Sequence, residues 1–239
     1  MFNFKTVIIL LITTMLIGCV VYKTHINVPE AKILTNSLNR ITHKAEISRD
    51  GETWSKTSKQ GTSFPIGDGL QVALTHCDVQ DFIANRTRFG IYRRDVEVKN
   101  RSYWIDDVEI ELVARLGDVS IYQKPYEADN PFTMGINPGI GTELLMLGDS
   151  FMDGNNWKTG MVSKLKVNKK RVKRDDDFDY CFIHTIPLNL GDSGSPVLAR
   201  RGGRYEVVGI ANAGVLRAQL YNFAIKVSRI KEAINLIGG

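Results

Sequence analysis

Short stretches of alternating or continuous apolar residues recur along most of the chain after Asp50, and they constrain its fold more than any other feature. Clusters of Gly, Asp and Asn separate them. Representative stretches are "GLQVALTHC", "VEIELVARL", "DVSIYQK", "TELLMLGDS", "YCFIHTI" and "YEVVGIANAG". Many short strands at this spacing are typical of an all-β sandwich or barrel. Only the end, Ser228 to Ile237, has apolar residues at helical spacing, which predicts a C-terminal helix.

The size and composition indicate a globular protein with a core of its own. A chain of 239 residues suits one large domain or two small ones that share a core. Its 43% hydrophobic and 24% charged residues exclude a disordered chain. A net charge of +5 is weak support for nucleic-acid binding, so no nucleic-acid partner is predicted. The sequence has no phosphate-binding glycine loop and no metal-ligand spacing, so we predict no cofactor and no metal.

The N-terminal residues read as a targeting segment. Lys5 precedes an apolar run of 11 residues, Val7 to Ile17, which fits the core of a secretory signal better than a membrane span. The run ends in "LIGC", which resembles a bacterial lipobox and implies lipidation of Cys19. The alternative is an uncleaved signal anchor. Either predicts an exported protein held at the cell envelope, with residues 1–19 as the signal.

Residues 20–50 are polar and mixed, and we predict a tether or arm there, with a short helix in "AKILTNSLNRI" as an option. If Cys19 carries lipid, Cys77 and Cys181 are the two remaining cysteines. An exported location permits a disulfide between them, but the sequence alone does not establish one.

A basic run, Lys164 to Arg174, holds seven Lys or Arg and is followed by four Asp in "DDDFDY". A polyanion-binding patch is one interpretation. A hairpin with opposed charges on its two arms is favoured, because opposite charges across neighbouring strands attract.

The stretch "GDSGSP", Gly191 to Pro196, is the strongest candidate for chemistry. Its residues could form an ordinary surface turn. They could also hold Ser193 as a nucleophile beside backbone N–H groups that bind an oxyanion. The second interpretation requires a base that removes the serine proton.

Four histidines could serve as that base. His25 and His43 lie in the predicted polar arm, and His184 lies within an apolar strand nine residues before Ser193. His76 ends an apolar strand, a rigid place from which to aim a side chain, and is the predicted base.

A carboxylate must orient the histidine. Asp118 is a single acid at the head of an apolar strand, where a charge needs a partner. Asp106 and Asp107 are its rivals, although a doubled acid is more often a solvated turn.

Four motifs in order resemble the chymotrypsin-like (trypsin-like) serine endopeptidases. "LTHC" resembles the family's histidine motif, "GDVSIYQ" its aspartate strand, "GDSGSP" its serine loop and "VVGIANAG" the strand that follows. The resemblance implies two antiparallel six-stranded β-barrels. Residues 51–130 would form the first barrel and 131–239 the second with the helix, joined near Asn130 to Gly141.

The resemblance also implies the roles of single residues. Ser193 attacks a peptide carbonyl, His76 carries its proton, Asp118 orients His76, and the N–H groups of Gly191 and Ser193 bind the oxyanion. Asp192 matches the acid that pairs with a newly freed N-terminus in animal zymogens. A lipid-blocked or arm-bearing N-terminus would not make that pairing, so we expect the loop to be held in some other way. The predicted partner is a polypeptide substrate; the alternative is an idle binding or scaffold protein on the same fold.

Substrate choice follows from the pocket that the resemblance implies. Its base would be Pro187, and the residues predicted to contact substrate are Pro187, Leu190, Asn212, Ala213 and Gly214. None of them is acidic, so cleavage after Lys or Arg is not expected, and a neutral residue is the default. Acceptance of Glu is a weaker expectation that depends on His184 or Thr185 reaching the pocket.

Overall fold

A computed structural model describes residues 34, 37–79, 82–87, 90–127, 130–149, 156–167, 178–215 and 218–238, without the side chains of 82–94 and 215–220. The contacts group the chain into Met1–Lys32 and Ile33–Gly239. The predicted signal, Cys19 and His25 lie outside the described residues, as does most of the basic run. In the part that is described, no helix has the length and apolar character needed to cross a membrane.

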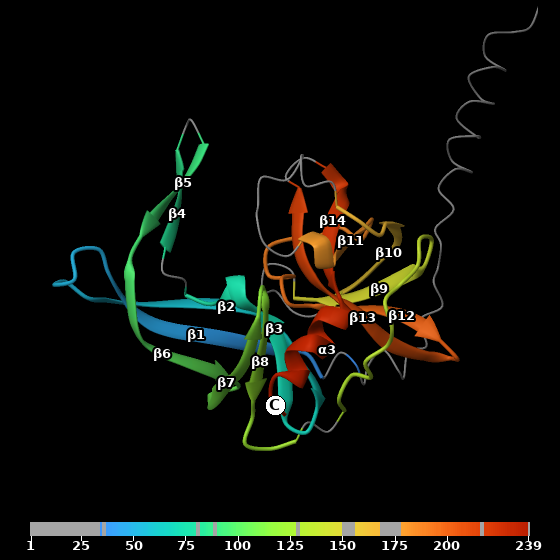
Figure 1. The fold of residues 1–239 in the computed structure, drawn as a ribbon, viewed down its shortest axis with the longest axis horizontal. Coiled ribbons are helices and arrows are strands. Elements are labelled where there is room, and N and C mark those ends of the chain that lie inside the picture. Colours follow the sequence, from blue (N-terminus) through green and yellow to red (C-terminus); the bar gives the residue numbers. More distant parts are fainter. Residues whose placement is uncertain are drawn as a thin grey trace, which may run out of the picture. The chain divides into compact units, whose positions relative to one another are not determined.

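The first half of Ile33–Gly239 forms a closed barrel of six antiparallel strands in the order β1-β2-β3-β8-β7-β6 (Figure 1). Its strands are β1 (Asn39–Ser48), β2 (Ser55–Gly67), β3 (Leu70–Leu74), β6 (Glu97–Ile105), β7 (Val108–Leu116) and β8 (Val119–Gln123). Between β3 and β6 the chain forms the short 3-10 helix η1 (Thr75–Cys77) and a separate hairpin of β4 (Phe82–Thr87) and β5 (Gly90–Asp95).

The second half forms another closed antiparallel barrel, in the order β10-β11-β14-β13-β12-β9. Its strands are β9 (Glu143–Gly148), β10 (Asn156–Lys164), β11 (Cys181–His184), β12 (Pro196–Arg201), β13 (Arg204–Val215) and β14 (Ala218–Lys226). The 3-10 helix η4 (Phe178–Tyr180) precedes β11, and α3 (Val227–Asn235) follows β14. Helix α3 contacts β7 and β8 of the first barrel as well as β13 and β14. The predicted fold class, two six-stranded barrels with a C-terminal helix, is confirmed.

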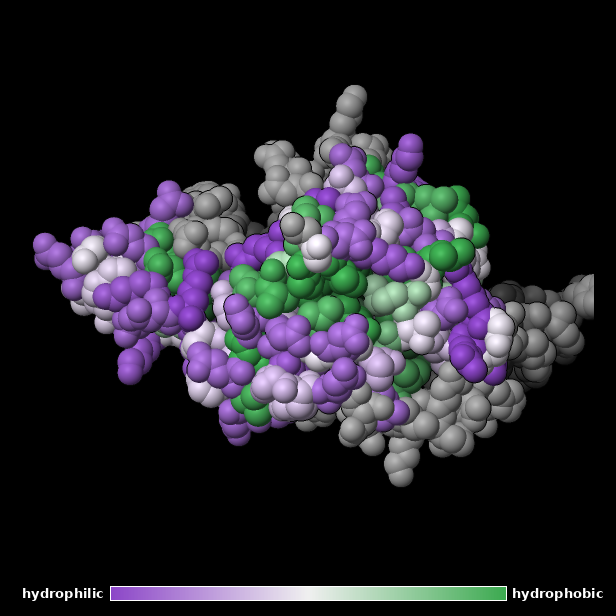
Figure 2. Space-filling model, turned by 60° about the horizontal axis from the view of Figure 1, so that its bottom comes forward, coloured by the Kyte–Doolittle hydropathy of each residue, from purple (hydrophilic) through white to green (hydrophobic). Residues whose placement is uncertain are grey.

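Each barrel has its own apolar core, which explains the repeated short stretches in the sequence. Ile41, Tyr103 and Tyr122 belong to the core of the first barrel, and Met146, Phe182 and others to that of the second. Alternate residues of a strand point to opposite faces, so one face fills the barrel and the other is solvated. The face in Figure 2 is mostly hydrophilic around a central apolar area.

The structure corrects the predicted boundary between arm and first barrel. Strand β1 begins at Asn39, inside the segment 20–50 that was predicted as a polar arm. The same strand excludes a helix that continues to Ile41. The polar residues of this segment suggested an arm because they form the exposed or half-buried face of β1, which includes Thr42, Lys44 and Glu46. Ile41 and Ala45 of the same strand point inward.

Candidate active site

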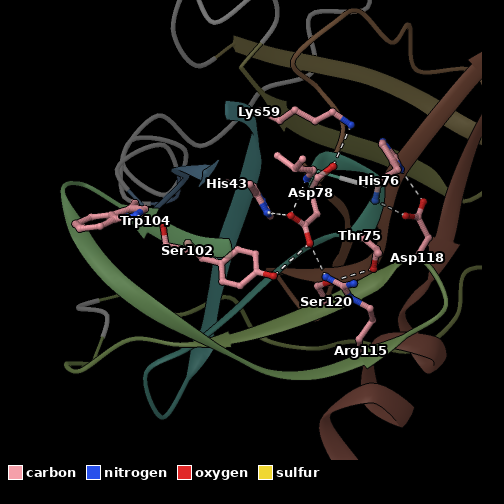
Figure 3. A network of polar contacts seen from close by, with 12 residues as sticks. His43, Lys59, Thr75, His76, Asp78, Ser102, Trp104, Arg115, Asp118 and Ser120 are labelled. Carbon is pink, nitrogen blue, oxygen red and sulfur yellow. Dashed lines mark hydrogen bonds and ion pairs between the residues drawn. The ribbon is translucent and has the colours of Figure 1, made fainter. Parts of the chain in front are cut away.

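His76 and Asp118 meet where two turns of the first barrel come together (Figure 3). The first, called here the histidine turn (Thr75–Asp78), follows β3; the second, the aspartate turn (Gly117–Asp118), joins β7 to β8. Asp118 Oδ2 lies 2.7 Å from His76 Nδ1, and Asp118 Oδ1 accepts the His76 backbone N–H at 2.7 Å. One carboxylate therefore fixes both the ring and the backbone of His76.

Thr75 adds further bonds between the two turns. Its backbone N–H donates to the Asp118 carbonyl at 2.8 Å, and its hydroxyl donates to the Gly117 carbonyl at 3.1 Å. The Thr75 hydroxyl is also 2.8 Å from the Ser120 hydroxyl. The pairing of β3 with β8 brings these groups into register, since Leu74 lies opposite Val119. The predicted neighbours His76 and Asp118 are thus brought together by adjacent strands.

The surroundings of His76 change its proton affinity in opposite directions. Burial disfavours the charged ring and lowers the pKa of His76, but the hydrogen bond and charge of Asp118, with a further contribution from Cys77, outweigh burial and raise it above the ordinary 6.5. The His76 side chain remains 32% exposed, so it is accessible to a reactant. Its free ring nitrogen can gain or lose a proton while Asp118 holds the other.

The serine loop (Gly191–Pro196) packs against this region from the second barrel. The Ser193 carbonyl accepts the Thr62 N–H at 3.1 Å and lies 3.9 Å from Cys77 Sγ, the residue next to His76. The Ser193 hydroxyl donates to the Asn212 carbonyl at 3.2 Å. Among the described residues, it makes no hydrogen bond to His76. The loop is therefore beside the histidine turn, with its hydroxyl turned toward β13.

Two N–H groups of the serine loop have no acceptor among the described residues. Asp192, Gly194 and Ser195 donate their backbone N–H groups to carbonyls at 3.0–3.2 Å. The N–H groups of Gly191 and Ser193 have no such partner within the described part of the chain. Gly191 has a φ of +96°, in the region that glycine tolerates best. Within the described residues, these two N–H groups remain available as donors, and their role in binding an anionic oxygen stays a prediction.

Gly194 is required by the close approach of the two barrels at this loop. Its φ is +93°, and a side chain there would collide with the Thr62 carbonyl oxygen. The Thr62 hydroxyl also donates to the Gly191 carbonyl at 2.8 Å. Strand β2 of the first barrel therefore supports the serine loop of the second.

A buried ion pair holds the acid of the loop. Asp192 is fully buried, and its Oδ2 contacts Nζ of Lys158 in β10, whose side chain is 11% exposed. The same carboxylate oxygen accepts the Asn189 N–H at 2.6 Å. The sequence did not identify a partner for Asp192. In the structure that partner is Lys158. Nothing in the sequence marks Lys158, because its distance from Asp192 depends on the fold of the whole barrel.

Of the residues predicted to contact substrate, Asn212 lies beside Ser193, and Gly214 is backed by Asn222, which the sequence did not mark. Leu190 is exposed and Asn212 is beside the Ser193 hydroxyl. Asn222 of β14 is buried; it donates to the Ile186 carbonyl at 2.7 Å. Its Oδ1 lies 2.6 Å from where a Cβ on Gly214 would be. Asn222 therefore fills space behind Gly214 with a neutral amide.

The other residues that the sequence offered for the site lie in buried strands or in an exposed turn. His184 is fully buried in β11, and burial lowers its pKa to about 4, so the ring is neutral near pH 7. A neutral ring does not supply the cation that a Glu side chain would need. Asp106 and Asp107 form the exposed turn between β6 and β7, and within the described residues neither bonds to His76. His43, predicted to lie in the polar arm, is instead fully buried in β1.

The two cysteines among the described residues are both buried and belong to different barrels, Cys77 in η1 and Cys181 at the start of β11. They are not joined by a disulfide. The first barrel is therefore not cross-linked to the second through these thiols.

Comparisons with known proteins agree on the architecture. No family model and no curated protein sequence matches the chain. Among solved structures, the active form of the Rv3671c protease from M. tuberculosis matches with a TM-score of 0.63 and 15% identity, over 91% of this chain and 87% of that one. Deg5 matches with a TM-score of 0.57 and 16% identity, over 88% and 93%. The HtrA-type protease AlgW, solved with a decapeptide, matches with a TM-score of 0.57 and 16% identity, over 87% and 65%. The chain thus has the chymotrypsin-like double-barrel fold of these proteases.

Proposed function

We propose that this protein is a serine endopeptidase in which Ser193 is the nucleophile, His76 the general base and Asp118 the residue that orients His76. The observation that carries the proposal is the bonded His76–Asp118 pair beside a serine loop in which the N–H groups of Gly191 and Ser193 have no acceptor within the described part of the chain. The shared fold with several proteases supports it.

The reaction would begin with rotation of the Ser193 hydroxyl from the Asn212 carbonyl toward His76. His76 Nε2 takes the hydroxyl proton as Ser193 Oγ attacks the peptide carbonyl, and Asp118 stabilises the imidazolium through Nδ1. The N–H groups of Gly191 and Ser193 bind the oxyanion. The proton then passes to the leaving amine, and a water molecule hydrolyses the acyl-enzyme by the same route.

The test is cleavage of a peptide library by the purified protein and by four variants. Ser193→Ala and His76→Ala should each reduce turnover by several orders of magnitude, and the double variant should be little worse, because the residues act as a unit. Ser163→Ala, a serine of β10 outside the site, is the matched control and should remain active. Robust turnover by Ser193→Ala would show that the assignment is wrong.

A second candidate function is a binding or scaffold protein on the same fold. The hydrogen bond from the Ser193 hydroxyl to Asn212, and not to His76, favours this alternative. Labelling by a fluorophosphonate separates the two, because only an activated serine reacts. Rapid labelling of the wild type with none of Ser193→Ala would exclude the idle scaffold.

The pocket supports a neutral residue before the cleaved bond. Pro187 is exposed and uncharged, and the buried His184 is neutral near pH 7. We therefore expect that Lys, Arg and Glu are not favoured at the residue before the cleaved bond. Matched peptides that differ only at this residue measure the preference. A tenfold higher kcat/KM for the Arg peptide would contradict the pocket assignment.

For location, the "LIGC" motif motivates export followed by lipidation at Cys19. Mass spectrometry of the mature N-terminus should then detect a lipid on Cys19, and Cys19→Ser should leave the membrane fraction or stay unprocessed. An unlipidated mature N-terminus at another residue would contradict this part of the proposal.

A further inference from the structure

The histidine turn continues into a second polar cluster, centred on Asp78 and separate from the His76–Asp118 contact (Figure 3). Asp78 follows Cys77, and its side chain is 3% exposed. Its Oδ2 accepts from Arg115 NH2 at 2.7 Å and from the Tyr103 hydroxyl at 3.3 Å. Its Oδ1 lies 3.3 Å from His43 Nδ1. A buried carboxylate is thus held by groups from three strands of the first barrel.

The charge of this cluster is balanced by its cationic neighbour. Burial raises the pKa of Asp78, but hydrogen bonding and charge interactions with His43 and Arg115 outweigh burial and lower it to about 2. Asp78 is therefore ionised at neutral pH. The Asp78 backbone is also fixed, since its carbonyl accepts from Lys59 Nζ at 3.0 Å and its N–H donates to the Thr75 carbonyl at 2.9 Å.

The position of Arg115 gives the ion pair a consequence for the site. Arg115 lies in β7, three residues before Asp118, so it belongs to the hairpin that carries the aspartate turn. Thr75 bonds to that hairpin on one side of His76, and Asp78 bonds to it on the other. A turn held at one end can pivot. A turn held on both sides of His76 keeps the His76 ring aligned with Asp118.

We propose that Asp78 and Arg115 are positioning residues that fix the histidine turn against the aspartate turn and so keep His76 aligned with Asp118. The inference rests on the proposed function, because alignment has a kinetic effect only if His76 is the base. Neither residue touches the reacting atoms. Misplacement of a reacting group by about 1 Å can cost on the order of 100-fold in rate.

The test compares Arg115→Met, Arg115→Lys and Asp78→Asn with wild type, at a temperature where thermal denaturation shows each to be folded. Arg115→Met and Asp78→Asn should lower kcat by on the order of 10- to 100-fold with KM within about twofold. Arg115→Lys, which keeps the charge, should recover part of the loss. Arg229→Met is the matched control: it removes an arginine that pairs with Glu232 on helix α3, and should keep wild-type kcat.

A readout independent of turnover is the NMR signal of the proton between His76 Nδ1 and Asp118, assigned by its absence in His76→Ala. The signal should broaden or shift in Arg115→Met and remain unchanged in Arg229→Met. If the wild type is active but Arg115→Met and Asp78→Asn keep kcat within twofold, the inference is wrong while the proposed function stands. If the wild type neither cleaves nor labels, the proposed function fails, and an unchanged signal in Arg115→Met would overturn the positioning role as well.

Discussion

At the scale of single residues, Asp118 determines the proton affinity of His76. Its hydrogen bond and charge raise the pKa of His76 above 6.5. Because a base must be neutral to accept a proton, kcat/KM should rise with pH on a limb whose midpoint lies above 6.5. Asp118→Asn removes the charge, so the midpoint should move to lower pH and the maximal rate should fall by several orders of magnitude.

The measurement is the pH profile of kcat/KM for wild type and Asp118→Asn with one peptide substrate. Asp106→Asn is the matched control, since Asp106 lies in the exposed turn between β6 and β7. Its profile should match that of the wild type. A large loss in Asp106→Asn with an unaffected Asp118→Asn would transfer the orienting role to Asp106.

The position of Asn222 leads to a prediction about the size of the substrate side chain that the pocket accepts. The Asn222 amide occupies the space behind Gly214, so Asn222→Ala should enlarge the pocket. The ratio of kcat/KM for a Phe peptide over an Ala peptide should rise about tenfold, which corresponds to about 1.4 kcal/mol. Asn235→Ala, at the end of α3, should leave the ratio unchanged. An unchanged ratio in Asn222→Ala would show that this side chain does not limit the pocket.

At the scale of elements, strand β10 and the serine loop depend on each other through Lys158 and Asp192. Lys158→Met leaves the buried Asp192 without its cation, and breaking a buried pair typically costs about 3–5 kcal/mol. Urea denaturation should show a loss of this size. Labelling by a fluorophosphonate should fall as well, because Asp192 lies between Gly191 and Ser193, whose N–H groups are the proposed oxyanion donors.

A compensating variant separates stability from loop geometry. The double variant Lys158→Met/Asp192→Asn has no unpaired buried charge. It should therefore recover part of the stability that Lys158→Met loses, without recovering the labelling rate. Lys164→Met, at the exposed end of the same strand, should change neither. Full labelling by Lys158→Met would show that the ion pair does not support the loop.

At the scale of the whole molecule, Asp78 contributes to the resistance of the fold to acid. Its pKa is lowered on folding from 3.8 to about 2. A lowered carboxyl pKa stabilises the folded state above the unfolded value, by about 2 kcal/mol here, and this contribution is lost as pH falls from about 4 toward 2. The difference in unfolding free energy between wild type and Asp78→Asn, measured in urea, should shrink by about 2 kcal/mol over that interval. A constant difference would contradict the lowered pKa.

The sequence predicts what depends on local pattern and misses what depends on register. Alternation along the strands predicts an all-β fold, and the four motifs that resemble the chymotrypsin-like endopeptidases imply the two barrels and the pairing of His76 with Asp118. The strand pattern alone left Asp106 and Asp107 as rivals of Asp118. Strand β1 was missed because its outward face is as polar as an arm. Lys158, Arg115 and Asn222 carry no local signal, since their partners Asp192, Asp78 and Gly214 become neighbours only once the strands pair.

The Lys158–Asp192 pair also bears on when the protein becomes active. The cation that holds the serine loop is a side chain of β10, so it is in place as soon as the second barrel folds. No cut in the chain is needed to create it. If the protein is the serine endopeptidase proposed above, a newly folded molecule should therefore need no activating cleavage to hold its serine loop, whether or not a signal segment is removed.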